Sequence, residues 1–168
     1  TQTGRREHRL AVCADWIMSL AWSPDGKRLA LASRDRTARV LDAATGEGIT
    51  SFTAHAASVN ALAFTADGEK IVSAGRNASV WRWNSTDAEK KESLGPVGAE
   101  IVTLRATSEG FFTAGAEGRL RYQAFQEPKT QIPYEADAGR LNTLAIHSGN
   151  RRLAAGGHDG RIWLWEIG

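Results

Sequence analysis

The sequence repeats itself with a period of about 42 residues. The segment 19–26 (SLAWSPDG) reappears as 61–68 (ALAFTADG), and two further copies begin at Thr103 and Thr143. The downstream ends also align, at residues 38–42, 80–84, 120–124 and 162–166. The third copy is two residues shorter, and we expect the deletion between Gly110 and Phe111, in a turn, because loops tolerate changes in length. A period of about 40 to 45 residues is typical of folds that repeat one small unit around an axis.

Each copy contains four short stretches rich in apolar, aromatic or β-branched residues, separated by clusters of Gly, Asp, Asn or Ser, which is the pattern of strands and turns. In the second copy the expected strands are Gly48–Ala54, Ser58–Phe64, Lys70–Ala74 and Ser79–Trp83. The second of these is apolar on both faces, as in a strand that is covered on both sides. Four-stranded units of this kind form the blades of a β-propeller. The expected fold is therefore all-β, with four antiparallel blades that form a partial ring or half of a larger propeller.

Short motifs recur at fixed places within the copies. The second copy contains Ala54-His55, Asp67-Gly68, Asn77 and Trp83-Asn84, and the fourth ends with Asp159-Gly160 and Trp165-Glu166. In these features the whole chain resembles the WD-repeat family, whose repeats contain a Gly-His pair, an Asp in a tight turn and a closing Trp-Asp. The resemblance divides the chain into repeats at about 5–46, 47–88, 89–128 and 129–168.

The resemblance also implies a hydrogen-bonded network inside each blade. In the second copy it maps to His55, Ser73, Asn77 and Trp83, and in the fourth it retains Asp159 and Trp165. A buried imidazole and indole need such partners. The first and third copies lack most of these residue types, so their blades are expected to depend mainly on apolar packing.

Composition and motifs exclude several classes of function. The single Cys13 allows no internal disulfide, and we find neither metal-ligand spacing, nucleophile elbow nor phosphate-binding glycine loop. No apolar run approaches the ~20 residues of a membrane span. No catalytic residue, metal or cofactor is therefore expected, and the cytoplasm is the favoured compartment. The net charge of +2 includes 16 Arg and 5 Lys, a bias that suggests a bacterial source.

Function is then expected on exposed loops. In the WD-repeat family, partners commonly bind the face formed by the loops before the second strand and before the fourth strand of each repeat; we call this the loop face. The candidate binding residues there are Trp16, Arg34, Arg36, Ser58, Arg76, Glu100, Glu117, Arg140 and His158. Arginine and exposed aromatic side chains are enriched in binding hot spots. We therefore expect a non-catalytic protein-interaction scaffold that binds a protein or peptide, with an acidic or carboxylate-bearing peptide as a reasonable partner class.

Two other functions stay open. The chain could be the docking or sensor module of an enzyme whose catalytic domain lies elsewhere, or a nucleic-acid-binding propeller, which would lose affinity steeply with salt. The ring is also expected to be incomplete, because Thr3-Gly4 lies 42 residues before Thr45-Gly46 and so matches the end of a preceding repeat. Further blades of the same parent chain, or a second copy, would complete it. In a homodimer, a strand at Arg5–Val12 would pair with Arg161–Trp165 of the other copy.

Overall fold

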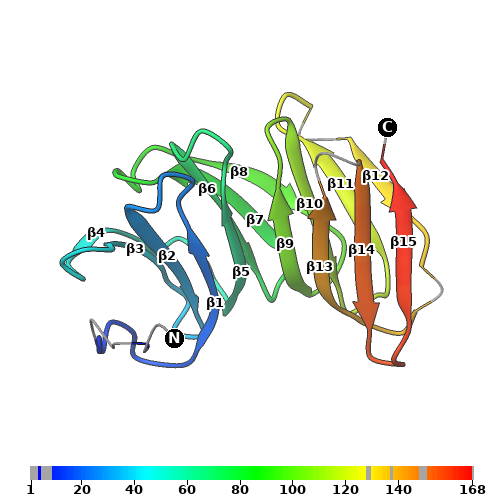
Figure 1. The fold of residues 1–168 in the computed structure, drawn as a ribbon, viewed down its shortest axis with the longest axis horizontal. Helices are drawn as coiled ribbons and strands as arrows, with labels where there is room; N and C mark the ends of the chain where they lie inside the picture. Colours follow the sequence, from blue (N-terminus) through cyan, green and yellow to red (C-terminus); the bar gives the residue numbers. More distant parts are fainter. Residues whose placement is uncertain (1–3, 5–8, 128–129, 137, 148–150, 168) are drawn as a thin grey trace.

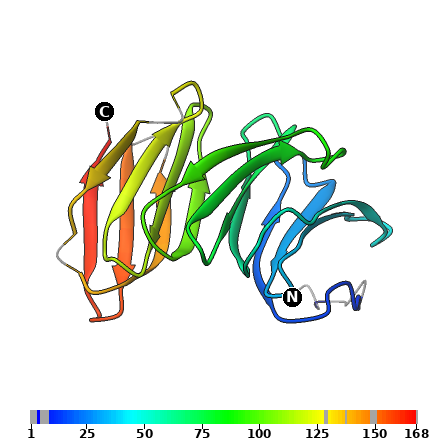
Figure 2. The same cartoon turned by 180° about the vertical axis from the view of Figure 1, so that it is seen from behind.

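The computed structural model describes residues 4, 9–127, 130–136, 138–147 and 151–167. Within them the chain forms antiparallel β-sheets that lie side by side, as both views show (Figures 1 and 2). We call the sheets blades 1 to 4. Blade 1 consists of β1 (Ile17–Trp22), β2 (Arg28–Ser33), β3 (Ala38–Asp42) and β4 (Gly48–Phe52). Blade 2 consists of β5 (Val59–Phe64), β6 (Lys70–Gly75), β7 (Ser79–Asn84) and β8 (Lys91–Pro96).

The second half of the chain continues this pattern. Blade 3 consists of β9 (Ile101–Ala106), β10 (Gly110–Gly115), β11 (Leu120–Ala124) and β12 (Gln131–Tyr134). Blade 4 has three described strands, β13 (Leu141–His147), β14 (Arg152–Gly157) and β15 (Ile162–Glu166). The first strands of successive blades, β1, β5, β9 and β13, lie next to one another. The expected all-β fold of antiparallel blades in a partial ring is therefore confirmed.

The strands expected in the second copy form at the expected places, with ends that differ by at most two residues. They do not all belong to one sheet, however. β4 pairs with β3, whereas β5, β6 and β7 belong to the next blade. Each four-stranded blade thus takes its last strand from the following sequence copy, which links neighbouring blades through the chain itself.

The strand register shows that the two-residue deletion of the third copy lies at a different place from the one expected. Lys70 pairs with Asn84 at the start of β6, and Gly110 pairs with Ala124 at the start of β10. Gly110 is therefore the counterpart of Lys70, the first residue of a strand, and not of the turn glycine Gly68. The expected deletion after Gly110 was wrong; the shortening lies before it, within residues 107–109. Matching glycine to glycine misled the sequence alignment, because Gly110 occupies a strand position.

The core lies in the seams between blades. One buried cluster joins blades 1 and 2 around Phe52 and Trp83, a second joins blades 2 and 3 around Val72 and Leu104, and a third joins blades 3 and 4 around Leu144. Each blade thus buries a face only against its neighbours. Burial of apolar area in these seams is the main force that holds the blades side by side.

The outer edges of the arc are open, as the sequence predicted. Large apolar side chains are exposed on β1 and β15, namely Ile17, Met18, Leu20, Trp22, Ile162 and Leu164. The strand expected at Arg5–Val12 in a homodimer stays a prediction: residues 5–8 lie outside the described part of the chain, and in the single chain residues 9–12 are not in a strand. No helix in the described ranges is long and apolar enough to cross a membrane.

Candidate functional site

An arginine-lined cavity opens where the loop face meets the inner strands. It has a volume of about 450 Å³ and is lined by Trp16, Met18, Arg34, Ser58, Asn60, Arg76, Glu100, Val102, Arg140 and Asn142. Six of the nine candidate binding residues are among them. They come from all four blades, so the arrangement depends on the packing of the blades and not on any one loop. We call this cavity the mouth site.

The charges of the mouth site are uneven. Three arginines line it, and Glu100 is the only carboxylate among the lining residues. Arg76 Nε lies 3.9 Å and Arg140 Nη2 lies 3.7 Å from the same Glu100 oxygen. Arg34 instead pairs with Asp15 at 3.7 Å and lies 5.4 Å from the ring centre of Trp16, whose side chain is 70% exposed. The arginines are therefore held loosely, by long ion pairs at a wet surface.

A column of β-bulges supplies lining residues that the sequence analysis missed. The pairing register slips at the second residue of β1, β5, β9 and β13, and those residues are Met18, Asn60, Val102 and Asn142. Bulges of this kind redirect side chains and are common next to functional sites. Asn60 donates to the carbonyl of Ile101 over 2.9 Å and accepts from Ser58. These residues lie two positions after Trp16, Ser58, Glu100 and Arg140, but periodicity does not reveal the slip in register that occurs at them.

Three of the candidate residues lie away from this cavity. Arg36 is exposed at the tip of the β2–β3 turn, with a left-handed backbone (φ 72°). Glu117 is exposed in the β10–β11 turn and is paired with Arg121. His158 is exposed in the β14–β15 turn, where its ring lies close to Gly139. The structure therefore does not bring these three side chains together with the mouth site.

Blade 2 contains a continuous chain of hydrogen bonds around His55. Trp83 donates to Ser73 Oγ over 3.0 Å, and Ser73 Oγ lies 2.8 Å from His55 Nε2. His55 Nδ1 lies 3.2 Å from Ser79 Oγ, which donates to Asn77 Oδ1 over 2.8 Å. Ser79, which the motif does not include, thus links Asn77 to the histidine.

The bonding pattern fixes the charge state of this histidine. Because the Ser79 hydroxyl already donates to Asn77, His55 Nδ1 donates to Ser79, and Nε2 accepts from Ser73. One ring nitrogen donates and the other accepts, which is the neutral form. Burial lowers the pKa of His55 from 6.5 to about 4, in agreement with this assignment. His55 is buried among these partners, and its ring has no exposed edge from which to act on a substrate.

Blades 1 and 3 fill the same place with an ion pair. In blade 1, Arg39 Nη1 lies 3.1 Å from Asp35 Oδ2 and 2.9 Å from Cys13 Sγ. In blade 3, Arg121 pairs with Glu117. The sequence analysis did not foresee these ion pairs, in which an arginine on the third strand of each blade reaches the turn carboxylate. That blades 1 and 3 depend mainly on apolar packing stays a prediction.

Blade 4 retains less of the network. Asp159 accepts from the backbone N–H of Arg161 over 3.2 Å and so fixes its own turn. Trp165 packs, half-buried, against the apolar cluster between blades 3 and 4. Asp137, which takes the histidine position of the repeat in the fourth copy, lies outside the described residues. Among the described side chains, no group of three or more His, Cys, Asp or Glu could hold a metal ion.

Comparison with known proteins agrees with this architecture. The family model for the anaphase-promoting complex subunit 4 WD40 domain matches residues 12–67, and the model for the WD domain, G-beta repeat, matches residues 129–166. Denticleless protein homolog of Danio rerio is 29% identical over 96% of this chain, and the U3 snoRNP-associated protein-like EMB2271 of Arabidopsis thaliana is 25% identical over 89%. The solved structure of U3-55K superposes with a TM-score of 0.81 at 25% identity over 92% of the chain.

The blades define a β-propeller segment, and the chain belongs to the WD40-repeat family. Domains of this family generally act as non-catalytic scaffolds that bind protein partners. The chain spans 24% of the Danio rerio relative and 47% of the U3-55K chain, so it corresponds to part of a larger propeller. The relatives named here are eukaryotic, and they give no support to the bacterial source that the Arg and Lys usage suggested.

Proposed function

We propose that the mouth site is a non-catalytic docking site for an acidic, carboxylate-bearing segment of a protein partner. The observation that carries the proposal is the convergence of Arg34, Arg76 and Arg140 on one cavity whose lining contains a single carboxylate. An arginine guanidinium can grip a carboxylate through two parallel hydrogen bonds, which makes such pairs strong and directional. Trp16 adds an exposed aromatic surface at the rim, of the kind that dominates binding energy at interfaces.

Glu100 holds Arg76 and Arg140 near the cavity but leaves both guanidinium groups available to a ligand. Both ion pairs are longer than a hydrogen bond, at 3.7 Å and 3.9 Å, and solvent-exposed pairs contribute only about 0 to 1 kcal/mol. An incoming carboxylate can therefore replace Glu100 as the partner of Arg76 or Arg140 at little cost. In the free protein Glu100 keeps the guanidinium groups close to the position that the ligand needs.

A labelled peptide tests the proposal directly. The probe is a blocked octapeptide of alternating glutamate and glycine, and its glutamine counterpart is the neutral reference. We expect the glutamate peptide alone to bind, and we expect Arg76→Gln and Arg140→Gln each to weaken binding about tenfold, close to 1.4 kcal/mol. Glu100→Gln removes the competing carboxylate and should strengthen binding. Fluorescence anisotropy measures the affinity of the glutamate peptide for the unaltered protein and for each of the three variants.

The matched control is Lys90→Gln, which removes one positive charge from the opposite end of blade 2, in the turn between β7 and β8. Equal losses for Lys90→Gln and Arg76→Gln would show only general attraction to a basic protein and would contradict a specific site. A single-stranded oligonucleotide that binds more tightly than the peptide, with affinity falling steeply as salt rises, would instead favour the nucleic-acid alternative.

The open edges of the arc require a partner of their own. Trp22 and Leu20 on β1 and Leu164 on β15 are more than half exposed, and exposed apolar strand edges favour association. The superposition on less than half of the U3-55K chain supports closure by further propeller blades, from the same parent chain or from a second copy. The native mass separates these possibilities: a homodimer doubles the 18.2 kDa of this chain. A monodisperse 18 kDa particle with a cooperative melt would contradict the need for closure.

A further inference from the structure

One basic side chain bridges the seam between blades 1 and 2, at the end away from the loop face. Arg28, the first residue of β2, donates to Ser85 Oγ over 2.5 Å and to the carbonyl oxygen of Gly68 over 3.0 Å. Its guanidinium carbon also lies 5.7 Å from the ring centre of Phe64. A cation from one blade is thus held by oxygen acceptors and an aromatic ring of the next.

The same place in the seam between blades 3 and 4 has no such side chain. In the strand register, Arg28 of β2 lies opposite Asp42 of β3. In blade 3 the corresponding residue is Gly110, which lies opposite Ala124. β10 thus begins with a glycine, which has no side chain to reach across the seam. On the facing blade, Ile146 stands at the strand position of Phe64. Ile167 stands at that of Ser85, because each lies two residues after the matching tryptophan, Trp165 or Trp83.

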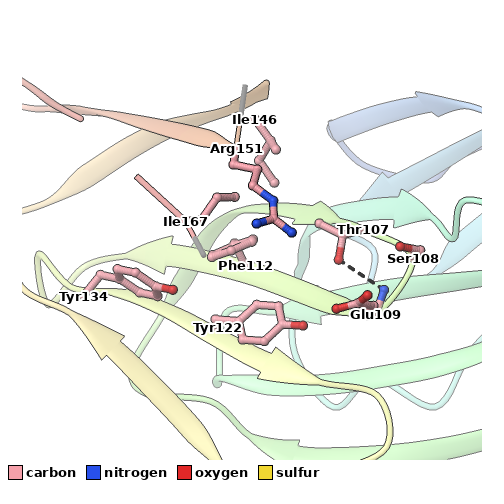
Figure 3. A pocket seen from close by; sticks show the side chains of 9 residues that line it. All are labelled: Thr107, Ser108, Glu109, Phe112, Tyr122, Tyr134, Ile146, Arg151 and Ile167. Atoms are coloured by element: carbon pink, nitrogen blue, oxygen red, sulfur yellow. Dashed lines mark hydrogen bonds between the residues drawn. The ribbon is translucent and has the colours of Figure 1, made fainter. Parts of the chain in front are cut away.

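A cavity of about 290 Å³ occupies this position (Figure 3). Its lining consists of Thr107, Ser108, Glu109, Phe112, Tyr122, Tyr134, Ile146, Arg151 and Ile167. We call it the seam cavity. It lies between two blades that are both present in the chain, so it does not result from the open edges of the arc. Its volume is sufficient for one large side chain of a partner.

Three aromatic rings form one wall of the seam cavity. The ring centres of Phe112 and Tyr122 are 4.8 Å apart, and those of Phe112 and Tyr134 are 6.0 Å apart, with tilted planes in both pairs. Phe112 and Tyr122 are direct cross-strand partners, which places them on the same face of blade 3. Faces of aromatic rings attract cations, and the attraction grows when the cation is removed from water.

Glu109 provides the negative charge at the edge of this wall. Within the described part of the chain its carboxylate makes no ion pair and accepts no hydrogen bond, and Figure 3 shows it beside Tyr122. Burial raises the pKa of Tyr122, and the charge of Glu109 adds to the effect. The carboxylate is therefore electrostatically coupled to the aromatic wall but unpaired.

Arg151 reaches the cavity from blade 4. Figure 3 shows its side chain directed toward Phe112, yet in the described residues its guanidinium has neither an ion-pair partner nor a hydrogen bond. Arg151 is exposed, so it can turn out into solvent. It thus occupies part of the space that Arg28 fills in the first seam, without the contacts that hold Arg28 in place.

We propose that the seam cavity binds the cationic side chain of an Arg or Lys residue from a protein partner. The ligand side chain takes the place that Arg28, a residue of the chain itself, fills between blades 1 and 2. The aromatic wall contacts the aliphatic part of the ligand side chain, and Glu109 pairs with its charged group. Arg151 moves aside on binding. This site is separate from the mouth site, which attracts the opposite charge, so the two proposals are tested by different probes.

The test uses blocked pentapeptides of sequence Gly-Ser-X-Ser-Gly, with X as arginine, as the neutral isostere citrulline, or as glutamate. Calorimetric titration should show binding of the arginine peptide and at least tenfold weaker binding of the citrulline peptide. Glu109→Gln should weaken binding about tenfold, equivalent to 1.4 kcal/mol. Arg151→Gln should leave the affinity unchanged or raise it, because it removes a competing cation.

The matched control is Glu69→Gln, which changes the exposed turn glutamate at the corresponding position of blade 2 and should have no effect. Equal binding of the citrulline peptide, or no change in Glu109→Gln, would overturn the proposal. Binding of the glutamate peptide that is lost in Arg151→Gln would make the cavity an anion site. Binding of agmatine without binding of the arginine peptide would show a site for free small cations and would also overturn it.

Discussion

Blades 1 and 2 have nearly the same backbone but differ in the chemistry of their interior. Both contain four strands with the same turn geometry, and both have a non-glycine residue with a left-handed backbone in the turn before the third strand, at Arg36 and Ala78. Blade 2 fills the space beneath this turn with neutral hydrogen-bonding groups centred on His55. Blade 1 fills it with the ion pair of Arg39 and Asp35.

In both blades the polar groups at this point are satisfied, although the residues that satisfy them differ. In blade 2 every donor of the chain from Trp83 to Asn77 has an acceptor. In blade 1, burial alone would raise the pKa of Asp35, but hydrogen bonds from Thr37, Ala14 and Arg39 hold it well below 3.8. Unpaired buried groups would be costly in either blade. The two solutions should respond differently to substitution, to pH and to removal of one partner.

The largest expected effect is the loss of Trp83. Its side chain is fully buried, stacks on Phe52 with ring centres 5.1 Å apart, and donates to Ser73. Truncation of such a side chain costs about 3 to 5 kcal/mol. Trp83→Ala should therefore lower the free energy of unfolding by about that amount in a urea titration. Trp16→Ala, which removes a mostly exposed indole, is the control and should change stability by less than about 0.5 kcal/mol.

The second effect is a loss of stability in mild acid. The pKa of His55 is 6.5 when unfolded and about 4 when folded, so the unfolded state binds an extra proton between these values. Stability is fully present above pH 6.5, falls as the pH decreases toward 4, and loses up to about 3 kcal/mol over that window. His55→Gln should abolish this window while the loss caused by Asp35 persists, because the lowered pKa of Asp35 places its contribution below pH 3.8. A pH series of urea titrations shows whether the two windows separate.

The sequence could predict blade 2 better than its neighbours, for a physical reason. The His, Ser and Trp side chains of blade 2 are the residue types that the family motif contains, so their positions could be inferred one by one. Ser79 was missed because it lies between two motif positions and its role depends on the bend of the turn. Arg39 was missed because a charged residue on a strand suggests an exposed side chain, and only the folded turn shows that Asp35 is within reach.

The mouth site was predictable in part. Trp16, Ser58, Glu100 and Arg140 could be placed by their common position in the repeat. The bulge residues that complete the lining could not, because the slip in register follows from backbone pairing that periodicity alone does not reveal. The seam cavity was hidden for a related reason: Gly110 aligns with a turn glycine by sequence but with a basic strand residue by register.

The third effect concerns the ion pair itself. Arg39→Met keeps most of the side-chain volume but leaves Asp35 half-buried without its cation. We expect a loss of about 1 to 3 kcal/mol, the cost of an unpaired charged hydrogen-bonding group. A double-mutant cycle with Asp35→Asn should give a coupling free energy of about 1 kcal/mol or more, because the remaining cost disappears once the carboxylate is neutral. Additive losses would mean that the two side chains act independently and that blade 1 does depend mainly on apolar packing.

The smallest effect is a gain. Arg36 and Ala78 adopt φ values of 72° and 65°, whereas blades 3 and 4 have Gly118 and Gly160 at the corresponding turn position. A left-handed backbone costs an L residue about 1 to 2 kcal/mol, and glycine avoids this cost but loses more entropy on folding. Arg36→Gly should therefore stabilise the protein by about 0.5 kcal/mol, since the exposed Arg36 side chain contributes little packing. Ala78→Gly should gain less or lose stability, because the Ala78 methyl group is buried. Equal gains at both positions in paired urea titrations would show that burial of this methyl does not distinguish the two blades.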